Sequence, residues 1–302
     1  MNPRPNALIR TTSNIIAAFM PTRRMRHSVR DFIRRTKARK FATYKLIKQE
    51  WENRGLHPIP ARYDEYDLIF GIGAACMTSY ILRDFRLRQF SNPFEWVSGT
   101  PLGLDRDSRF MEKINALCTE FHDFFNYEDF QLRSAYHTAP HIVHQDIINT
   151  RHNIIYWHLF PSDISWERYF PIAREKIMRR ASRLIDAMNK SQRILIVWGA
   201  RMGPQRNEPD RIIRDDEIKQ AVQMVGKKWP NHDIDFVFFE HDGTLDKFDF
   251  RKITVCPGAY RIQSNHFDAA PEYDARHPNK SIQHIPPLVV AEMLDNIKLR
   301  NK

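Results

Sequence analysis

Short apolar runs and longer amphipathic segments follow one another along most of the chain. The apolar runs, each of strand length, lie near residues 66–71, 153–158, 193–198 and 234–240. The segments with helical spacing of apolar residues lie near residues 76–85, 106–120, 166–189, 214–226 and 286–298. Strands that alternate with helices are typical of layered α/β proteins, so we expect an α/β domain with a mainly parallel sheet flanked by helices.

The turn after the first predicted strand is the most informative local feature. Gly71 and Gly73 follow the apolar run 68–70, and a helix-like segment begins at Cys76. The glycines allow a tight turn, and a helix N-terminus favours a thiolate because its amide N–H groups and positive dipole end stabilise negative charge. The pattern therefore predicts a cysteine nucleophile. For a lone cysteine, the alternative is a small buried packing residue.

The same turn also resembles a phosphate-binding Gly-x-Gly-x-x-Gly motif. Gly71 and Gly73 match its first two glycines, whereas Cys76 takes the third position, where close packing of helix and strand requires Gly or Ala. Nucleotide binding is therefore an alternative function for this turn.

Further blocks of sequence accompany the turn. They are a Leu-Arg pair at 82–83, a Pro-Phe-Glu-Trp box at 93–96, a Trp-His-Leu-Phe strand end at 157–160, a helix with adjacent Arg179 and Arg180, and the apolar strand 194–198. Together with the turn they resemble a bacterial family described as papain-like cysteine peptidases. The resemblance covers roughly residues 66–200.

The resemblance implies a nucleophile at Cys76 and a histidine base at His158. It extends more distantly to Cys–His enzymes that acetylate capsular sugars, which implies acyl transfer through a thioester. Two positions depart from the family pattern: Glu95 replaces the aspartate of the Pro-Phe-Asp-Trp box, and Leu159 replaces the aspartate that follows the histidine.

The residues themselves also suggest a catalytic set. A cysteine nucleophile needs a base, and histidine is the usual one because its pKa lies near neutral pH. We expect His158 to project from a strand end toward the edge of the sheet that carries the cysteine, with His144 as the alternative base. Asp163 is the first candidate for the carboxylate that orients the histidine, and Asp242 and Glu240 are alternatives.

The remaining candidate residues surround this set. Backbone N–H groups at the helix start, from Cys76 and Met77, are expected to stabilise an oxyanion, with Gly71 and Gly73 shaping the turn. Aromatic rings and carboxylates suit sugars, arginines suit anionic groups, and loops after strand ends border ligand crevices. On these grounds the predicted substrate-binding residues are Arg88, Asn92, Glu95, Trp96, Arg179 and Arg201.

Two of these predictions have structural alternatives. Phe94 and Trp96 could anchor a loop in the core instead of lining a site. Arg179 and Arg180 point about 100° apart on a helix, so at most one of them is expected to face a site, with the other in solvent.

Basic residues concentrate at the start of the chain. Residues 1–60 hold 14 Lys and Arg against 3 acidic residues, a net charge of +11 that equals the formal net charge of the whole chain. Apolar residues at helical spacing with arginine-rich flanks suit a helix on an anionic membrane, so we expect residues 1–40 to contact such a surface. Packing of this segment on the body is the alternative. Nucleic acid is an unlikely partner because no recognition motif is present.

These features define the expected organisation and location. We expect a basic amphipathic helical N-terminal extension at 1–60 and an α/β catalytic domain at 61–302. Three scattered cysteines form no disulfide framework, and no apolar run reaches the ~20 residues of a membrane span. The expected location is cytoplasmic and peripheral, at the inner face of the membrane.

The expected function is that of a Cys–His dependent acyltransferase, or a related transferase, in cell-surface polysaccharide synthesis. The donor would be acyl-coenzyme A and the acceptor a sugar or lipid-linked glycan, with no covalently bound cofactor. The spacing of His141 and His144 is too weak a pattern to predict a metal site. The alternatives are a papain-like cysteine peptidase and a nucleotide-sugar glycosyltransferase or its non-catalytic partner.

Overall fold

The computed structural model describes residues 49–55, 59–73, 76–95, 97–99, 109–139, 142–199, 213–246, 249–265 and 288–300. The chain divides into two compact units, Met1–Pro58 and Ile59–Lys302. In the first unit only 49–55 is described, and residues 49–53 are helical. The predicted basic extension therefore lies mostly outside the described residues, and it stays a prediction.

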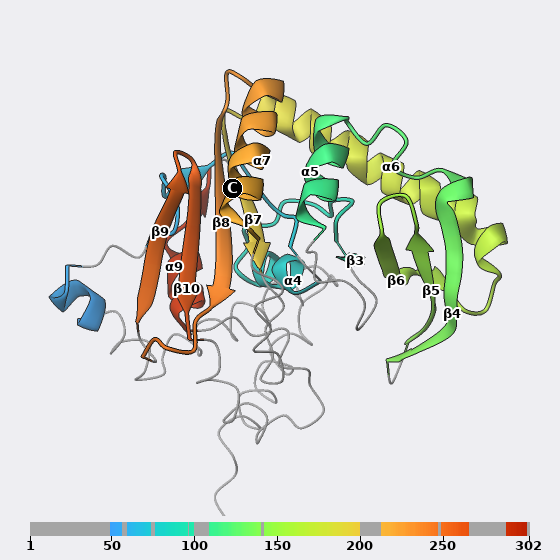
Figure 1. Cartoon of the computed structure of the whole chain (residues 1–302), viewed down its shortest axis with the longest axis horizontal. Coiled ribbons are helices and arrows are strands. Elements are labelled where there is room, and N and C mark those ends of the chain that lie inside the picture. Colours follow the sequence, from blue (N-terminus) through green and yellow to red (C-terminus); the bar gives the residue numbers. More distant parts are fainter. Residues whose placement is uncertain are drawn as a thin grey trace, which may run out of the picture. The chain divides into compact units, whose positions relative to one another are not determined.

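The larger unit contains a five-stranded sheet in the order β2-β7-β8-β10-β9 (Figure 1). Its strands are β2 (Leu68–Gly71), β7 (Arg193–Gly199), β8 (Asp233–His241), β9 (Phe250–Cys256) and β10 (Ala259–Ser264). The first four strands in this order pair in parallel, and β9 is antiparallel to β10. The residues of β2 and nearly all of β7 are buried, as the continuous apolar runs of parallel strands covered on both faces should be.

A second sheet is wholly antiparallel, in the order β3-β6-β5-β4. Its strands are β3 (Val97–Gly99), β4 (Phe130–Ala139), β5 (Ile142–Asn149) and β6 (Ile154–Pro161). A short parallel pair joins β1 (Glu65–Tyr66) to β11 (Lys298–Leu299). The α/β class is confirmed. The expected mainly parallel sheet is not clearly shown, because β9 is antiparallel in the five-stranded sheet and the second sheet is wholly antiparallel.

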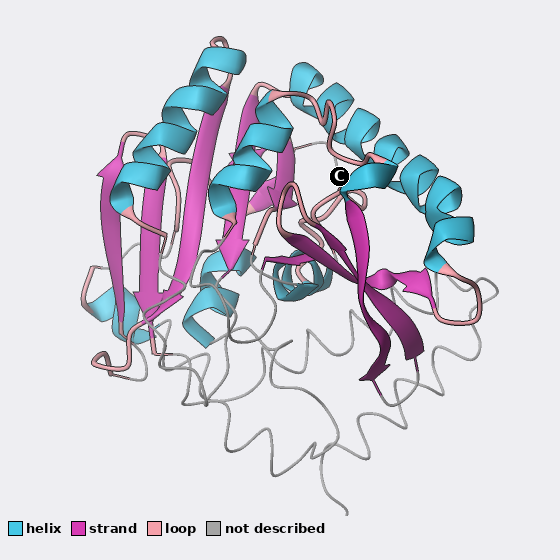
Figure 2. Ribbon diagram, turned by 45° about the vertical axis from the view of Figure 1, so that its right-hand side comes forward, coloured by secondary structure: helices cyan, strands magenta, loops and turns pink. Residues whose placement is uncertain are grey.

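Helices lie against these strands (Figure 2). They are α4 (Cys76–Asp84), α5 (Phe110–Cys118), α6 (Trp166–Lys190), α7 (Asp215–Lys228) and α9 (Leu288–Asp295), with a 3₁₀ turn η1 (Tyr127–Asp129). The helices predicted from periodicity are all present, with bounds that differ by a few residues for most of them. Helix α6 starts at an N-cap formed by Ser165, whose side chain accepts a hydrogen bond from the Arg168 N–H.

One apolar core runs through the larger unit. The buried stripe of α6 contributes Phe170, Ile177 and Leu184 to the same cluster as residues of β6 and β7. Near the five-stranded sheet, the Phe110 ring meets Trp198 and Phe238 edge-on, with both centroid distances at 5.5 Å. This packing fixes α5 beside the carboxyl ends of β7 and β8, which positions the region described next.

Candidate functional site

Two glycines at the end of β2 are required by close packing. A Cβ atom on Gly73 would overlap the side-chain oxygen of Thr78 and lie 3.0 Å from the Gly199 nitrogen. A Cβ on Gly71 would lie 2.7 Å from the Thr78 Cγ2 atom. Neither glycine has a positive φ angle, so the expected tight turn is not what requires glycine here. The space beside these glycines is filled by Thr78.

The first turn of α4 is fixed at the carboxyl ends of β2 and β7. Thr78 is buried, and its Oγ1 atom accepts a hydrogen bond of 3.2 Å from the Gly199 N–H at the end of β7. Helix α4 begins at Cys76, so the predicted position of this residue at a helix N-terminus is confirmed. The side chains of Cys76 and Met77 lie outside the described residues. In open α/β sheets, ligands bind at the carboxyl ends of parallel strands.

A lysine that was not among the predicted site residues contacts the turn between β2 and α4. The side chain of Lys113, on α5, is fully buried. Its Nζ atom donates hydrogen bonds to the carbonyl oxygens of Ile72, at 3.2 Å, and Gly73, at 2.7 Å. The same atom lies 5.2 Å from the centroid of the Trp198 ring. Gly73 precedes Cys76 by only three residues.

The charge of Lys113 is not cancelled by an acid in the described part of the chain. No ion pair between Lys113 and a carboxylate is found there. Burial alone lowers the pKa of Lys113 to about 7. A cation that titrates near neutral pH therefore lies at the turn that leads to Cys76. Perturbed groups of this kind cluster at functional sites.

The segment 88–95 is tied to the same turn. The Nδ2 atom of Asn92 donates to the carbonyl oxygen of Gly71 at 3.1 Å, and its Oδ1 atom accepts from the Phe94 N–H at 2.8 Å. Phe94 is buried against the rings of Phe121 and Phe124, so it anchors the segment in the core. The structural alternative is therefore confirmed for Phe94, whereas Trp96 lies outside the described residues.

Glu95 is held inside the protein by an arginine. It is only 2% exposed, and its Oε2 atom accepts from Arg88 Nη2 at 2.7 Å. Burial raises the pKa of Glu95, and the positive charge of Arg88 opposes this shift. Arg88 also donates to the Phe90 carbonyl at 3.2 Å and to the Ser91 hydroxyl. These contacts give Glu95 and Arg88 a role in shaping the segment, and direct contact with substrate stays a prediction for both.

The candidate bases lie in the other sheet. Strand β6 continues to Pro161 and pairs with β3 and β5, so His158 lies within an antiparallel strand. The expectation that His158 projects from a strand end on the same sheet edge as Cys76 is therefore wrong. The structure instead brings His158 and His144 together, with ring centroids 5.5 Å apart and the rings edge to face.

The three candidate carboxylates have different environments. Asp163 is exposed in the turn between β6 and α6. Asp242 accepts hydrogen bonds from the Thr244 N–H, at 2.9 Å, and hydroxyl, at 2.6 Å, which lower its pKa. Glu240 is buried and forms an ion pair with Arg261. Asp242 and Glu240 thus have local structural partners, and Asp163 stays a prediction.

The paired arginines of α6 differ in position, as their spacing predicted. Arg179 is exposed, whereas Arg180 is half-buried and close enough to Glu95 and Arg88 for their charges to affect its pKa. The structure thus points to Arg180, in place of Arg179, as the one that faces the segment 88–95. Arg201 lies outside the described residues.

Lys113 could have been found from the sequence. It lies three residues after Phe110 and four before Leu117, within the apolar stripe of the predicted helix 106–120. A lysine at such a position must be buried with its charge satisfied, or must be neutral.

Comparisons with known proteins give no relative. No protein-family model matches the chain, and neither a curated protein nor a solved structure matches it. The resemblance inferred from the sequence therefore stays a prediction. In the part of the chain that the structure describes, no helix is long and apolar enough to cross a membrane. The same residues include no group of three or more His, Cys, Asp or Glu side chains that could hold a metal ion.

Proposed function

We propose that the protein is a cysteine-dependent acyltransferase of cell-surface polysaccharide synthesis, with Cys76 as its nucleophile. One observation carries the proposal: Cys76 opens α4 at the carboxyl ends of β2 and β7, beside a turn whose carbonyl groups bind the buried Lys113 ammonium. Both the helix N-terminus and the cation favour negative charge, and the thiolate is the nucleophilic form of cysteine.

The proposed reaction has two steps. The Cys76 thiolate attacks the carbonyl carbon of an acyl-coenzyme A thioester, and the coenzyme A thiolate leaves, which forms an acyl-cysteine thioester. A hydroxyl group of the sugar acceptor then attacks this thioester. The base takes the hydroxyl proton, the ester product forms, and the Cys76 thiolate is restored. The N–H groups of Cys76 and Met77 would stabilise the oxyanion in both steps.

The assignment of the base rests on the sequence alone. His158 is the proposed base and Asp163 the proposed orienting carboxylate, with His144 beside His158 as the alternative. Lys113 is added to the set as a positioning residue, because it binds the backbone of the turn and places a positive charge there.

The location follows from the N-terminal charge. We propose that residues 1–40 hold the protein at the inner face of the membrane, where lipid-linked glycans would be available as acceptors. Flotation with anionic vesicles should carry the full chain upward, and deletion of residues 1–40 should release it. Equal flotation of both proteins would remove the membrane part of the proposal.

The most informative test compares donors. The purified chain would be incubated with a sugar acceptor and either acetyl-coenzyme A or a nucleotide sugar, and the product would be identified by mass. Acetylation of the sugar that disappears in Cys76→Ala supports the proposal. Glycosyl transfer that survives in Cys76→Ala would contradict it in favour of a glycosyltransferase, and peptide cleavage by the intact chain would favour a peptidase.

A further inference from the structure

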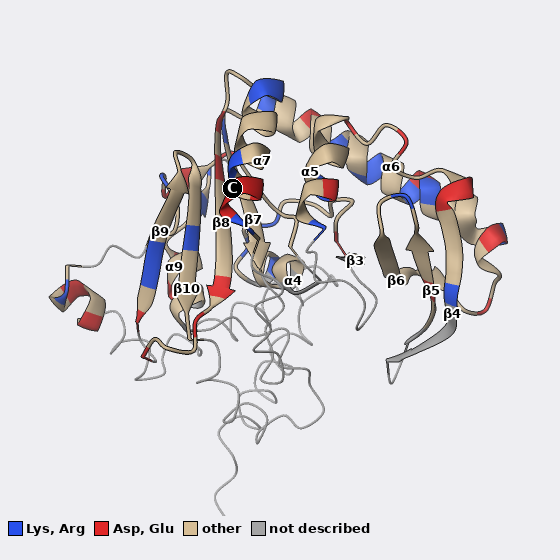
Figure 3. Ribbon diagram, in the orientation of Figure 1, with Lys and Arg blue, Asp and Glu red and all other residues tan. Residues whose placement is uncertain are grey.

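Four cations form a stripe on one side of α6. Lys176, Arg179, Arg180 and Arg183 are spaced so that they share one face of the helix, and we call them the basic stripe. Figure 3 shows Lys and Arg residues, in blue, along this helix. Within the described ranges, none of the four makes an ion pair with a carboxylate.

Two members of the basic stripe, Arg180 and Arg183, lie beside the segment 88–95. The guanidinium carbon of Arg183 lies 5.6 Å from the centroid of the Phe90 ring. The charge of Arg180 interacts with those of Glu95 and Arg88. Among the described residues, Glu95 raises the pKa of Arg180, and Glu95 is already bonded by Arg88. Arg88 and Arg180 thus lie near the buried carboxylate of Glu95, and Arg183 lies against the same segment.

The cations of the stripe repel one another. Burial lowers the pKa of Arg180; Glu95 opposes this shift, whereas Arg88, Arg179 and Arg183 lower the pKa further. Burial also lowers the pKa of Lys176, with Arg180 and Arg179 adding to the shift. Half-buried like charges destabilise the free protein, and a bound anion would remove this repulsion.

We propose that the basic stripe, with Arg88, is a binding site for the diphosphate group of a ligand. Arginine guanidinium groups match phosphate oxygens in paired hydrogen bonds, and several of them together favour a ligand with more than one phosphate. Asn92 joins the segment 88–95 to Gly71, so the site is attached to the turn that precedes Cys76. The existence of this site does not depend on the proposed function. Only the role of the ligand as the acyl donor, held next to Cys76, rests on the proposed function.

The test is a calorimetric titration of the full chain with inorganic pyrophosphate. We expect binding that weakens at high salt, and a loss of affinity of about tenfold or more in Arg183→Gln and in Arg180→Gln. Arg168→Gln is the matched control, because Arg168 is an exposed arginine of the same helix about 18 Å along its axis from Arg180. Since Arg180 is half-buried, the exposed Arg183 keeps the test valid if Arg180→Gln fails to fold.

Two results would overturn the site. One is the absence of pyrophosphate binding by the unmodified chain at millimolar concentration. The other is an equal loss in Arg168→Gln, which would indicate diffuse attraction by net charge. Competition then identifies the source of the diphosphate: displacement by coenzyme A indicates an acyl donor, and displacement by UDP-glucose indicates a nucleotide sugar. Because binding is also measured in Cys76→Ala, failure of the proposed chemistry leaves this test unaffected.

Discussion

The Nζ atom of Lys113 lies 2.7 Å from the carbonyl oxygen of Gly73, with no carboxylate paired to it among the described residues. Carbonyl dipoles solvate the ammonium group but do not cancel its charge. The field of a buried cation is weakly screened, so it acts on the turn and on the start of α4. The lysine thus links a structural contact to the proposed reactivity of Cys76.

Replacing this lysine should make Cys76 less reactive. In Lys113→Met the positive charge is lost while the apolar stem is kept. Because Lys113 is mainly charged only below about pH 7, we expect Cys76 to be alkylated more slowly in the variant at about pH 7 and below, and at a similar rate at higher pH. The measurement is the rate of alkylation of Cys76 against pH, with the site identified by peptide mass. Burial raises the pKa of Cys118 to about 11 and also raises that of Cys256, so both should react later and serve as internal references.

Lys190→Met, which removes an exposed lysine at the end of α6, is the control variant for charge. An unchanged Cys76 profile in Lys113→Met would show that the lysine does not act on the thiol.

The same lysine should make stability depend on pH. The pKa of Lys113 is about 7 in the folded chain, against an ordinary value of 10.5. Between these two values the unfolded chain binds more protons, so the free energy of unfolding should rise with pH, by at most about 1.4 kcal/mol per unit from this group. Urea unfolding of the intact chain and of Lys113→Met from about pH 7 to about pH 10 isolates the effect. The difference between the two curves should change across this window, and parallel curves would refute the assigned titration.

Gly73→Ala should destabilise the fold. Its Cβ would overlap the Thr78 hydroxyl and press on the Gly199 nitrogen, so a cost of about 1–3 kcal/mol in the free energy of unfolding is expected. Adding Thr78→Ala should recover part of that cost, because it removes the overlapping atom. Gly226→Ala on α7 is the matched control, since nothing lies within 4 Å of its Cβ position and alanine favours a helix. Chemical denaturation measures all four proteins, and a cost in Gly226→Ala equal to that in Gly73→Ala would contradict the packing argument.

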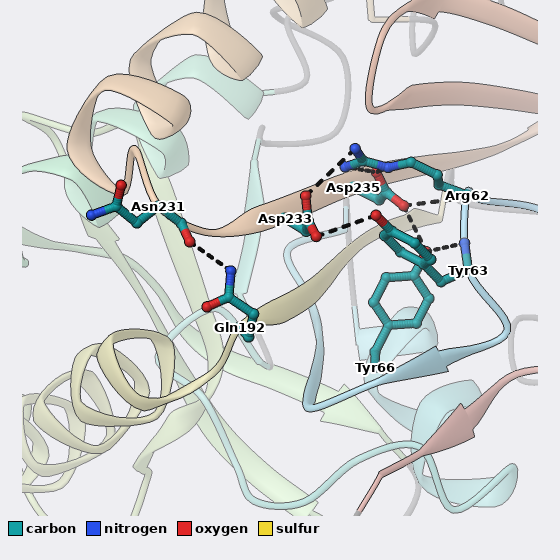
Figure 4. A network of polar contacts seen from close by, with 7 residues as sticks. All are labelled: Arg62, Tyr63, Tyr66, Gln192, Asn231, Asp233 and Asp235. Atoms are coloured by element: carbon teal, nitrogen blue, oxygen red, sulfur yellow. Dashed lines mark hydrogen bonds and ion pairs between the residues drawn. The ribbon is translucent and has the colours of Figure 1, made fainter.

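Asp235, near the start of β8, should stabilise the end of the five-stranded sheet that lies opposite to the carboxyl ends of its parallel strands (Figure 4). This fully buried carboxylate accepts bonds from Arg62 Nε at 3.1 Å, Arg62 Nη2 at 2.8 Å and the Tyr66 hydroxyl at 2.7 Å. Asp235→Asn removes the buried partner of Arg62 and leaves it only the exposed Asp233, at 3.6 Å, so we expect a loss of about 1.5–3 kcal/mol in the free energy of unfolding. Gln192→Ala removes an exposed hydrogen bond in the same region and should cost under about 1 kcal/mol. Similar losses in the two variants would show that the network adds little.

The sequence was informative where local periodicity determines structure. The runs at 66–71 and 193–198 are buried parallel strands, and α6 shows the apolar stripe expected of 166–189. The missed strands include β4, β5, β9 and β10, because polar residues interrupt their apolar pattern, and several residues of β4 and β9 are exposed. An antiparallel strand with one exposed face gives a weak signal of this kind.

The site was harder to predict because it depends on contacts between distant segments. A strand end does not reveal which sheet the strand joins, so His158 was assigned to the wrong sheet edge. The need for glycine at position 73 comes from Thr78 and Gly199 together, and the second of these is 126 residues away in sequence. Lys113 was visible as a charge in an apolar stripe, but its carbonyl partners on the turn were not.

Mass spectrometry of the intact chain after incubation with acetyl-coenzyme A tests the central claim most directly. We expect the mass of a single acetyl group to be added, with peptide mapping placing it on Cys76, and no addition in Cys76→Ala. Hydroxylamine should remove the group, as it does from a thioester. An adduct of the same amount in Cys76→Ala, or none on the intact chain, would contradict the account.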